Sequence, residues 1–69
     1  MNRFHLLPQG DCWKLTTEGG HTVFSGAQSR DYALRRAVEL VSLRTGVLRI
    51  HLADGTLQEE RTYPGYAAP

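Results

Sequence analysis

Apolar side chains recur at helical spacing within residues 29–46, between two residues that suit helix ends. At about 100° per residue they fall within one broad arc, which consists of Ala33, Leu34, Ala37, Val38, Leu40 and Val41. Polar residues such as Asp31 and Glu39 occupy the opposite side. Ser29 suits the N-cap, and Gly46 suits a left-handed C-terminal cap. The pattern predicts an amphipathic helix that packs on a core through the apolar arc.

Before this helix, residues 3–7, 12–17 and 21–25 alternate between apolar and polar side chains. Alternation with a period of two is typical of strands, and Pro, Gly and Asp residues, which favour turns, lie between these runs. Phe4 and Leu6 share one face of the first strand, and Trp13 and Leu15 share one face of the second. We therefore expect a hairpin followed by a shorter third strand.

After the helix, residues 47–52 form the clearest strand, with Leu48, Ile50 and Leu52 on one face. Asp-Gly at residues 54–55 predicts a two-residue type I′ hairpin turn, because both central positions of that turn need positive φ. This turn fixes the register of the last strand. The expected cross-strand pairs are Leu52 with Leu57, His51 with Gln58, and Arg49 with Glu60.

The same register places the charged Glu59 opposite Ile50, on the face that should be buried. Two explanations remain open. The last strand could be an edge strand whose inward charge discourages further pairing, or a β-bulge could shift it.

The predicted fold is an α+β domain of order βββαββ, in which an antiparallel five-stranded sheet has one helix packed on one face. One domain fills residues 1–69, with residues 3–63 ordered and a frayed tail at 64–69. The other face of the sheet is open to solvent or to a partner. The expected core residues of the sheet are Phe4, Leu6, Trp13, Leu15, Phe24, Leu48, Ile50, Leu52 and Leu57.

Composition narrows the classes of function. A chain of 69 residues buries only about 60% of the surface that its unfolded form exposes, which favours oligomerisation as a way to bury more apolar area. Its formal net charge is only +1. The chain is therefore not one of the strongly basic proteins for which charge alone would indicate nucleic-acid binding. The single Cys12 excludes an internal disulfide, and no Cys or His cluster predicts a metal or other cofactor. We find no signal peptide and no membrane span, and expect a soluble cytoplasmic protein.

Several short segments occur in an order that resembles a known family. They are FHLLP at residues 4–8, WKL at 13–15, the helix with Ala33 and Ala37, and IHLADGTLQ at 50–58, followed by Tyr63. Together, over residues 4–63, they resemble the bacterial family called domain of unknown function 2188. Its pattern has a His-Val-Val-Pro opening, a Trp-x-Val strand, a Thr-Lys-x-Glu-Ala helix and a closing hydrophobic-His-x-x-Asp-Gly-x-Ile-Gln segment.

The chain departs from that pattern at residues 29–33, where SRDYA removes the Lys and the Glu of the helix motif. The resemblance implies the fold and a bacterial source. It implies no activity, since none is established for the family and fold does not determine function.

The face of the sheet opposite the helix carries the first candidate interaction surface. By strand alternation its members are Arg3, His5, Lys14, Arg49 and His51. These side chains could bind phosphate groups or an acidic protein surface. They could equally form an ordinary solvated face whose charge Glu60 balances. His5 could instead be a half-buried residue that fixes strand pairing, and a zinc site at His5 and His51 would need at least one more protein ligand.

A flank of the helix, outside its main apolar arc, is the second candidate surface. Tyr32, Arg36 and Leu43 follow helical spacing there, together with Glu39. Two large side chains could remain exposed around a charge pair, which would suit a partner helix or a dimer. Alternatively, Tyr32 and Leu43 cover the margin of the sheet.

No nucleophile with a neighbouring base and no set of metal ligands is evident, so an enzyme is the least supported class. We expect a non-enzymatic interaction module that binds itself or another protein. The alternative is a nucleic-acid-binding module that uses the basic outer sheet face. No membrane partner is expected.

Overall fold

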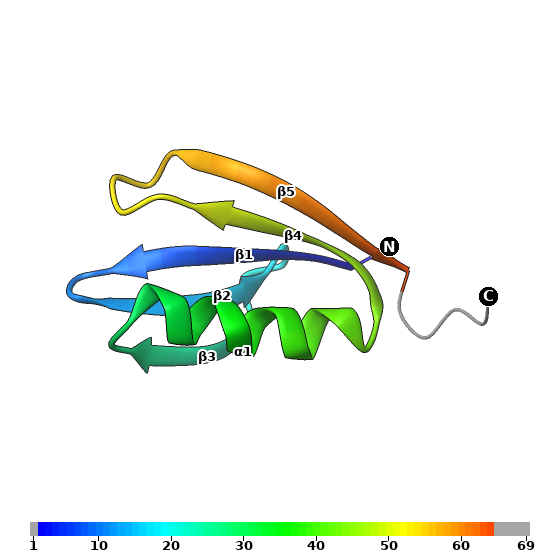
Figure 1. Ribbon diagram of the computed structural model, residues 1–69, viewed down its shortest axis with the longest axis horizontal. Helices are drawn as coiled ribbons and strands as arrows, with labels where there is room; N and C mark the ends of the chain where they lie inside the picture. The colour runs from blue at the N-terminus through cyan, green and yellow to red at the C-terminus, as the bar shows by residue number, and fades with distance from the viewer. Residues whose placement is uncertain (1, 65–69) are drawn as a thin grey trace.

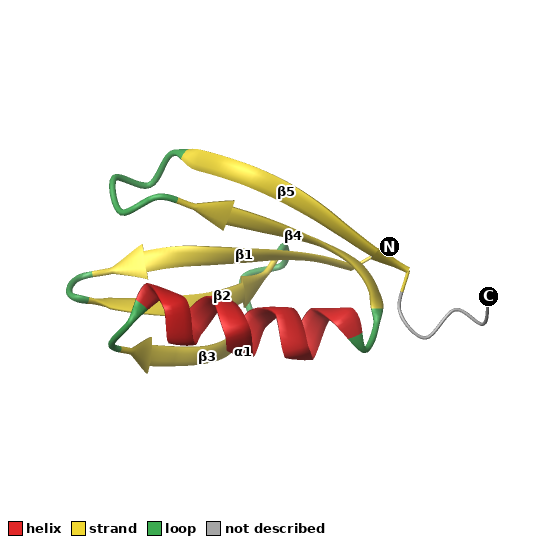
Figure 2. Ribbon diagram, in the orientation of Figure 1, coloured by secondary structure: helices red, strands yellow, loops and turns green. Residues whose placement is uncertain are grey.

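A computed structural model of the chain describes residues 2–64. In this part of the chain the elements are β1 (Asn2–Gln9), β2 (Cys12–Thr17), β3 (Thr22–Ala27), α1 (Arg30–Ser42), β4 (Thr45–His51) and β5 (Leu57–Pro64). They confirm the α+β fold with order βββαββ: the strands form one sheet, β3-β2-β1-β4-β5, and α1 lies along one face of it (Figures 1 and 2). Residues 65–69 of the tail predicted to fray lie outside the described residues.

At the centre of the sheet, β1 and β4 pair in parallel, with Phe4 opposite Leu48. The other three pairings are antiparallel, so the sheet is mixed and differs in this detail from the wholly antiparallel one expected. Parallel neighbours need a long crossover connection, usually a helix. Here α1 is that connection: it carries the chain from β3, at one edge, back across the sheet to β4 (Figure 1).

The helix begins and packs as its sequence predicts. Ser29 is the N-cap, and its Oγ accepts a hydrogen bond from the backbone N–H of Tyr32 at 3.2 Å. Ala33, Ala37 and Val41 are fully buried at i, i+4 and i+8. Two of these three side chains are small, which lets the helix lie close to the sheet. Within residues 2–64, no helix is long and apolar enough to cross a membrane.

The expected left-handed cap at Gly46 is wrong. The helix ends at Leu43, which has ordinary right-handed geometry. Gly46 instead lies within β4, opposite Asn2, and its φ is not positive. A Cβ at this position would lie 2.9 Å from the backbone oxygen of Asn2. The glycine is therefore explained by the close approach of β1, and not by a helix cap.

Most of the expected core is confirmed. Phe4, Leu6, Trp13, Leu15, Leu48 and Ile50 are buried, and Phe24 packs against them while partly buried. The prediction is wrong for two residues, because Leu52 and Leu57 are 39% and 51% exposed. Both errors come from the β4–β5 turn.

That turn has residues 53–55 as its loop, and is not the two-residue type I′ turn. The Gly55 N–H donates to the Leu52 carbonyl at 2.8 Å, and only Gly55 in the loop has a positive φ, of 90°. This is a type I turn followed by a left-handed glycine. Leu52 thus lies at the edge of the loop, outside β4.

The register of β5 changes once along the strand. Next to the loop, His51 pairs with Leu57 and not with Gln58, which places Leu57 on the outer side. A bulge between His51 and Ile50 then restores the expected register, so Arg49 pairs with Glu60 as predicted. The longer loop and the bulge each shift the pairing by one residue, in opposite senses.

Glu59 does pair with Ile50, so the charge does face inward, and the explanation by an edge strand fits the structure; the bulge is present but does not move Glu59 off this face. β5 is an edge strand, and it carries a bulge. Arg61 donates hydrogen bonds of 3.0 and 3.1 Å to the two oxygens of Glu59. This bidentate contact holds the pKa of Glu59 below its usual range.

We predict that Gly46→Ala destabilises the domain, because the added methyl group meets backbone that cannot rotate away. Forced overpacking of this kind costs about 1–3 kcal/mol. Urea unfolding should show a lower midpoint with an unchanged slope. Gly19→Ala is the matched control, since its Cβ would lie 4.0 Å from the nearest atom, Thr17 Oγ1, and it should unfold near the wild-type midpoint. Equal midpoints for both variants would contradict a tight β1–β4 contact.

Candidate functional site

The sheet face that α1 does not cover, here called the outer face, carries the first candidate surface. Its side chains come from alternate positions of β1, β2, β4 and β5. The face is not uniformly exposed, because Thr16 and Val47 near its centre are buried. The residues that the argument uses are Arg3, His5, Lys14, Arg49, His51, Leu57 and Glu60.

His5 and His51 meet on this face, where β4 ends. His5 lies opposite Arg49 in the parallel β1–β4 pair, so His51, two residues further along β4, projects on the same side. The His5 Nδ1 and the His51 Nε2 are 3.4 Å apart, and the ring centroids are 5.6 Å apart. Strand alternation predicted the shared side of the sheet, and the structure adds the direct contact.

Each histidine has an oxygen near its other ring nitrogen. The His51 Nδ1 lies 3.0 Å from the carbonyl oxygen of Gly55. The His5 Nε2 lies 3.5 Å from Glu18 Oε1, and the His5 side chain is 18% exposed. The four groups form a line across the outer face, from Glu18 through His5 and His51 to Gly55.

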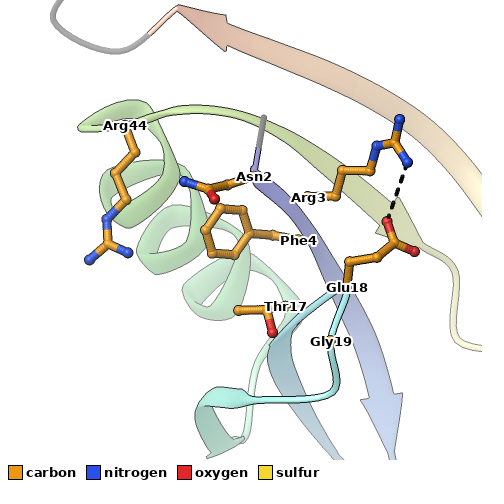
Figure 3. Close-up of a pocket in the computed structure, with 7 residues that line it drawn as sticks. All are labelled: Asn2, Arg3, Phe4, Thr17, Glu18, Gly19 and Arg44. Carbon is orange, nitrogen blue, oxygen red and sulfur yellow. Dashed lines mark ion pairs between the residues drawn. The ribbon is translucent and has the colours of Figure 1, made fainter.

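Glu18 is the member of this line that the sequence did not identify. It follows Thr17, the last residue of β2, and its backbone N–H donates to the Arg3 carbonyl at 2.9 Å. Its carboxylate also lies 3.9 Å from the Arg3 guanidinium. Both residues line a hollow of about 260 Å³. Figure 3 shows their ion pair, with Phe4 between it and Arg44. No local pattern reveals this role, because Arg3, the neighbour of Glu18 across the sheet, is distant in the sequence.

The arginines of the outer face are both paired with acids. Arg49 Nε donates to Glu60 Oε2 at 2.9 Å, as the cross-strand register predicted. Because both side chains are partly exposed, this pair contributes little to stability. Lys14 lies on β2, opposite Leu7 of β1, and is half-buried. The structure thus brings Arg3, His5, Arg49 and His51 together, with their positive charge largely matched by two glutamates.

The second candidate surface lies on the helix, away from the outer face. Tyr32 and Leu43 remain exposed, so their large side chains do not cover the sheet margin. Between them, Arg36 forms an ion pair with Glu39 at 3.7 Å. Tyr32 and Arg36 also line a shallow hollow against β3. The helix flank and the outer face are therefore separate surfaces.

Within residues 2–64, no group of three or more His, Cys, Asp and Glu side chains could hold a metal ion. Cys12 is a free, half-buried thiol opposite Gln9. The chemistry that this face offers is therefore hydrogen bonding, ion pairing and coordination by two imidazoles.

Residues 4–63 match the family described as "Uncharacterized protein conserved in bacteria (DUF2188)". The chain belongs to this family. The match confirms the resemblance seen in the sequence and covers both histidines of the outer face. No curated protein and no solved structure matches the chain.

The β4–β5 turn of this DUF2188 domain is held by Asp54. Its Oδ1 accepts hydrogen bonds from the Thr56 hydroxyl at 2.6 Å and the Thr56 backbone N–H at 2.9 Å. The hydroxyl and then the N–H lower the pKa of the Asp54 carboxyl. Since Gly55 lies between these two residues, the same contacts orient the carbonyl that accepts from His51.

We predict that the Thr56 amide signal in NMR titrates with Asp54, with a midpoint below the usual aspartate value of about 3.9. A carboxyl whose pKa is lowered by folding stabilises the fold above its unfolded-state pKa. That contribution is lost as the pH falls through the lower, folded-state pKa. Thr56→Val removes the hydroxyl donor and should move the midpoint upward. An unchanged midpoint in this variant would show that the hydroxyl does not hold the carboxylate.

Proposed function

We propose that this DUF2188 domain is a non-enzymatic interaction module that self-associates through its outer face. The observation that carries the proposal is the pairing of charges on that face. Arg3 lies beside Glu18, and Arg49 lies beside Glu60. A face that carries both signs in neighbouring pairs suits a protein surface better than a polyanion.

Self-association through one face requires that the face be complementary to itself, because a two-fold axis brings identical patches together. A bare basic face would repel its own copy. The outer face instead carries a glutamate near the start of β1 and another on β5, with basic groups between them. A second copy, rotated by 180°, can therefore bring its glutamates to the basic groups of the first copy.

Apolar area and the strand edges support the same surface. Leu57, opposite His51, is one of the most exposed large apolar side chains among residues 2–64. The free edge at β5 carries Glu59, Glu60 and Arg61, and charges on an edge strand discourage pairing with another sheet. This leaves the face of the sheet, and not that edge, for the contact.

The contacts of His5 support a role without catalysis. Its two ring nitrogens lie nearest to His51 and Glu18, which are both acceptors or bases. A general base needs a nucleophile or a substrate proton within hydrogen-bond reach, and neither of these two neighbours of His5 is one.

The proposal places the domain in the cytoplasm, where its single free Cys12 stays reduced.

We predict that light scattering on the purified chain gives twice the mass of one chain at high concentration. Leu57→Lys should shift the domain to monomer, because it adds a charge to the apolar part of the outer face. Leu43→Lys is the matched control on the helix flank, where the leucine is 52% exposed against 51% for Leu57. It should leave the dimer intact. A monomer at every concentration, or a dimer broken only by Leu43→Lys, would contradict the proposed interface.

The dependence of binding on salt concentration distinguishes a nucleic-acid partner from a protein partner. Binding to phosphates weakens steeply as salt rises, because it releases counterions. We expect no such binding to DNA or RNA oligonucleotides in fluorescence anisotropy at low salt. Affinity that appears at low salt, falls with added salt and is lost in Arg49→Glu would favour the nucleic-acid alternative.

A further inference from the structure

The hydrogen bond of His51 fixes the direction of its free lone pair. A carbonyl oxygen can only accept, so the His51 Nδ1, 3.0 Å from the Gly55 oxygen, carries a proton. In neutral His51 the Nε2 is then unprotonated. This Nε2 lone pair lies 3.4 Å from the His5 Nδ1.

His5 faces an electron-rich group at both ring nitrogens. Its Nε2 lies 3.5 Å from the Glu18 carboxylate, and its Nδ1 faces the lone pair of His51. A neutral imidazole carries a single N–H. If that N–H is at Nδ1, the Nε2 lone pair faces a carboxylate; if it is at Nε2, two lone pairs face one another across 3.4 Å. A positive charge at this pair, from a second proton or from a metal ion between the two rings, resolves this conflict.

We infer that the His5 Nδ1 and the His51 Nε2 bind one divalent transition-metal ion, of which Zn²⁺ is the example tested below. Zinc–imidazole bonds are about 2.0–2.1 Å long, so two nitrogens on one tetrahedral ion lie about 3.3–3.4 Å apart. The observed separation is 3.4 Å.

The groups behind the two rings match the usual surroundings of metal-binding histidines. Such a histidine donates its second N–H to a carboxylate or a backbone carbonyl, which fixes the tautomer and the ring orientation. Glu18 is in this position behind His5, and the Gly55 carbonyl is in this position behind His51. Asp54 and Thr56 hold the turn that presents the carbonyl.

The site is open and lacks strong repulsion. It lies on the outer face, where water can reach it and complete the coordination of the ion. Of the nearby cations, Arg49 is paired with Glu60, and Arg3 is paired with Glu18. Residues 2–64 provide no third protein ligand, so the proposed site has two protein nitrogens and water completes the coordination, in place of the further protein ligand that a zinc site was expected to need. Imidazole ligands suit Zn²⁺, Cu²⁺ and Ni²⁺.

Calorimetric titration of the whole chain with ZnCl₂ tests the site. We expect one ion per chain, and at least a tenfold loss of affinity in His5→Ala and in His51→Ala. His21→Ala is the matched control, because His21 precedes β3 and is exposed, and it should bind as the wild type does. Glu18→Gln should weaken binding about tenfold by loosening His5. Wild-type affinity in both His5→Ala and His51→Ala would overturn the assignment.

Nitrogen-15 NMR of the wild-type histidine rings tests the same site without relying on variants that fold. Zn²⁺ should shift the His5 Nδ1 and the His51 Nε2, and leave the protonated His51 Nδ1 in place. Shifts confined to His21, or no shift at all, would overturn the inference. The inference does not rest on self-association: Zn²⁺ bound to a chain that scatters light as a monomer would contradict the proposed function alone.

Discussion

The parallel pairing of β1 with β4 is the constraint on which the rest of the structure depends. It places β1 at the centre of the sheet, with β2 on one side and β4 on the other. Because parallel strands cannot be joined by a tight turn, the helix lies across the sheet and carries the chain from β3 to β4, which pairs with β1. The same pairing sets His5 opposite Arg49, and so brings His51 within reach of His5.

The crossover also explains why the two faces of the sheet differ. One helix buries a single face, and the fully buried Ala33 and Ala37 show how closely it approaches. At its first turn, Arg30 lies over the ring of Trp13 at 5.6 Å and donates a hydrogen bond to Gln58. These contacts hold the helix on the covered side of the sheet and so stabilise the fold. The polar and ionisable groups of the outer face are left uncovered by the helix (Figure 1).

The sequence patterns predicted correctly those features that depend on residues close together in the chain. Alternation identified Phe4 and Leu6 as core, and Ser29 was recognised as the N-cap because its side chain acts within one turn. Features that depend on distant segments were missed. Gly46 is needed because Asn2 lies beside it across the sheet, and no pattern near residue 46 reveals that contact. The parallel direction of β4 was missed for the same reason.

The error at Leu57 and the geometry of the histidine pair have one cause. Asp-Gly is compatible with more than one hairpin turn, and here the loop includes residue 53 and leaves only Gly55 with positive φ. That choice moves Leu57 opposite His51, onto the outer face. It also turns the Gly55 carbonyl toward the His51 Nδ1, which leaves the Nε2 lone pair facing His5. The turn that makes the predicted register wrong near the loop therefore also orients the two imidazoles. A two-residue turn would place Gln58, and not Leu57, opposite His51.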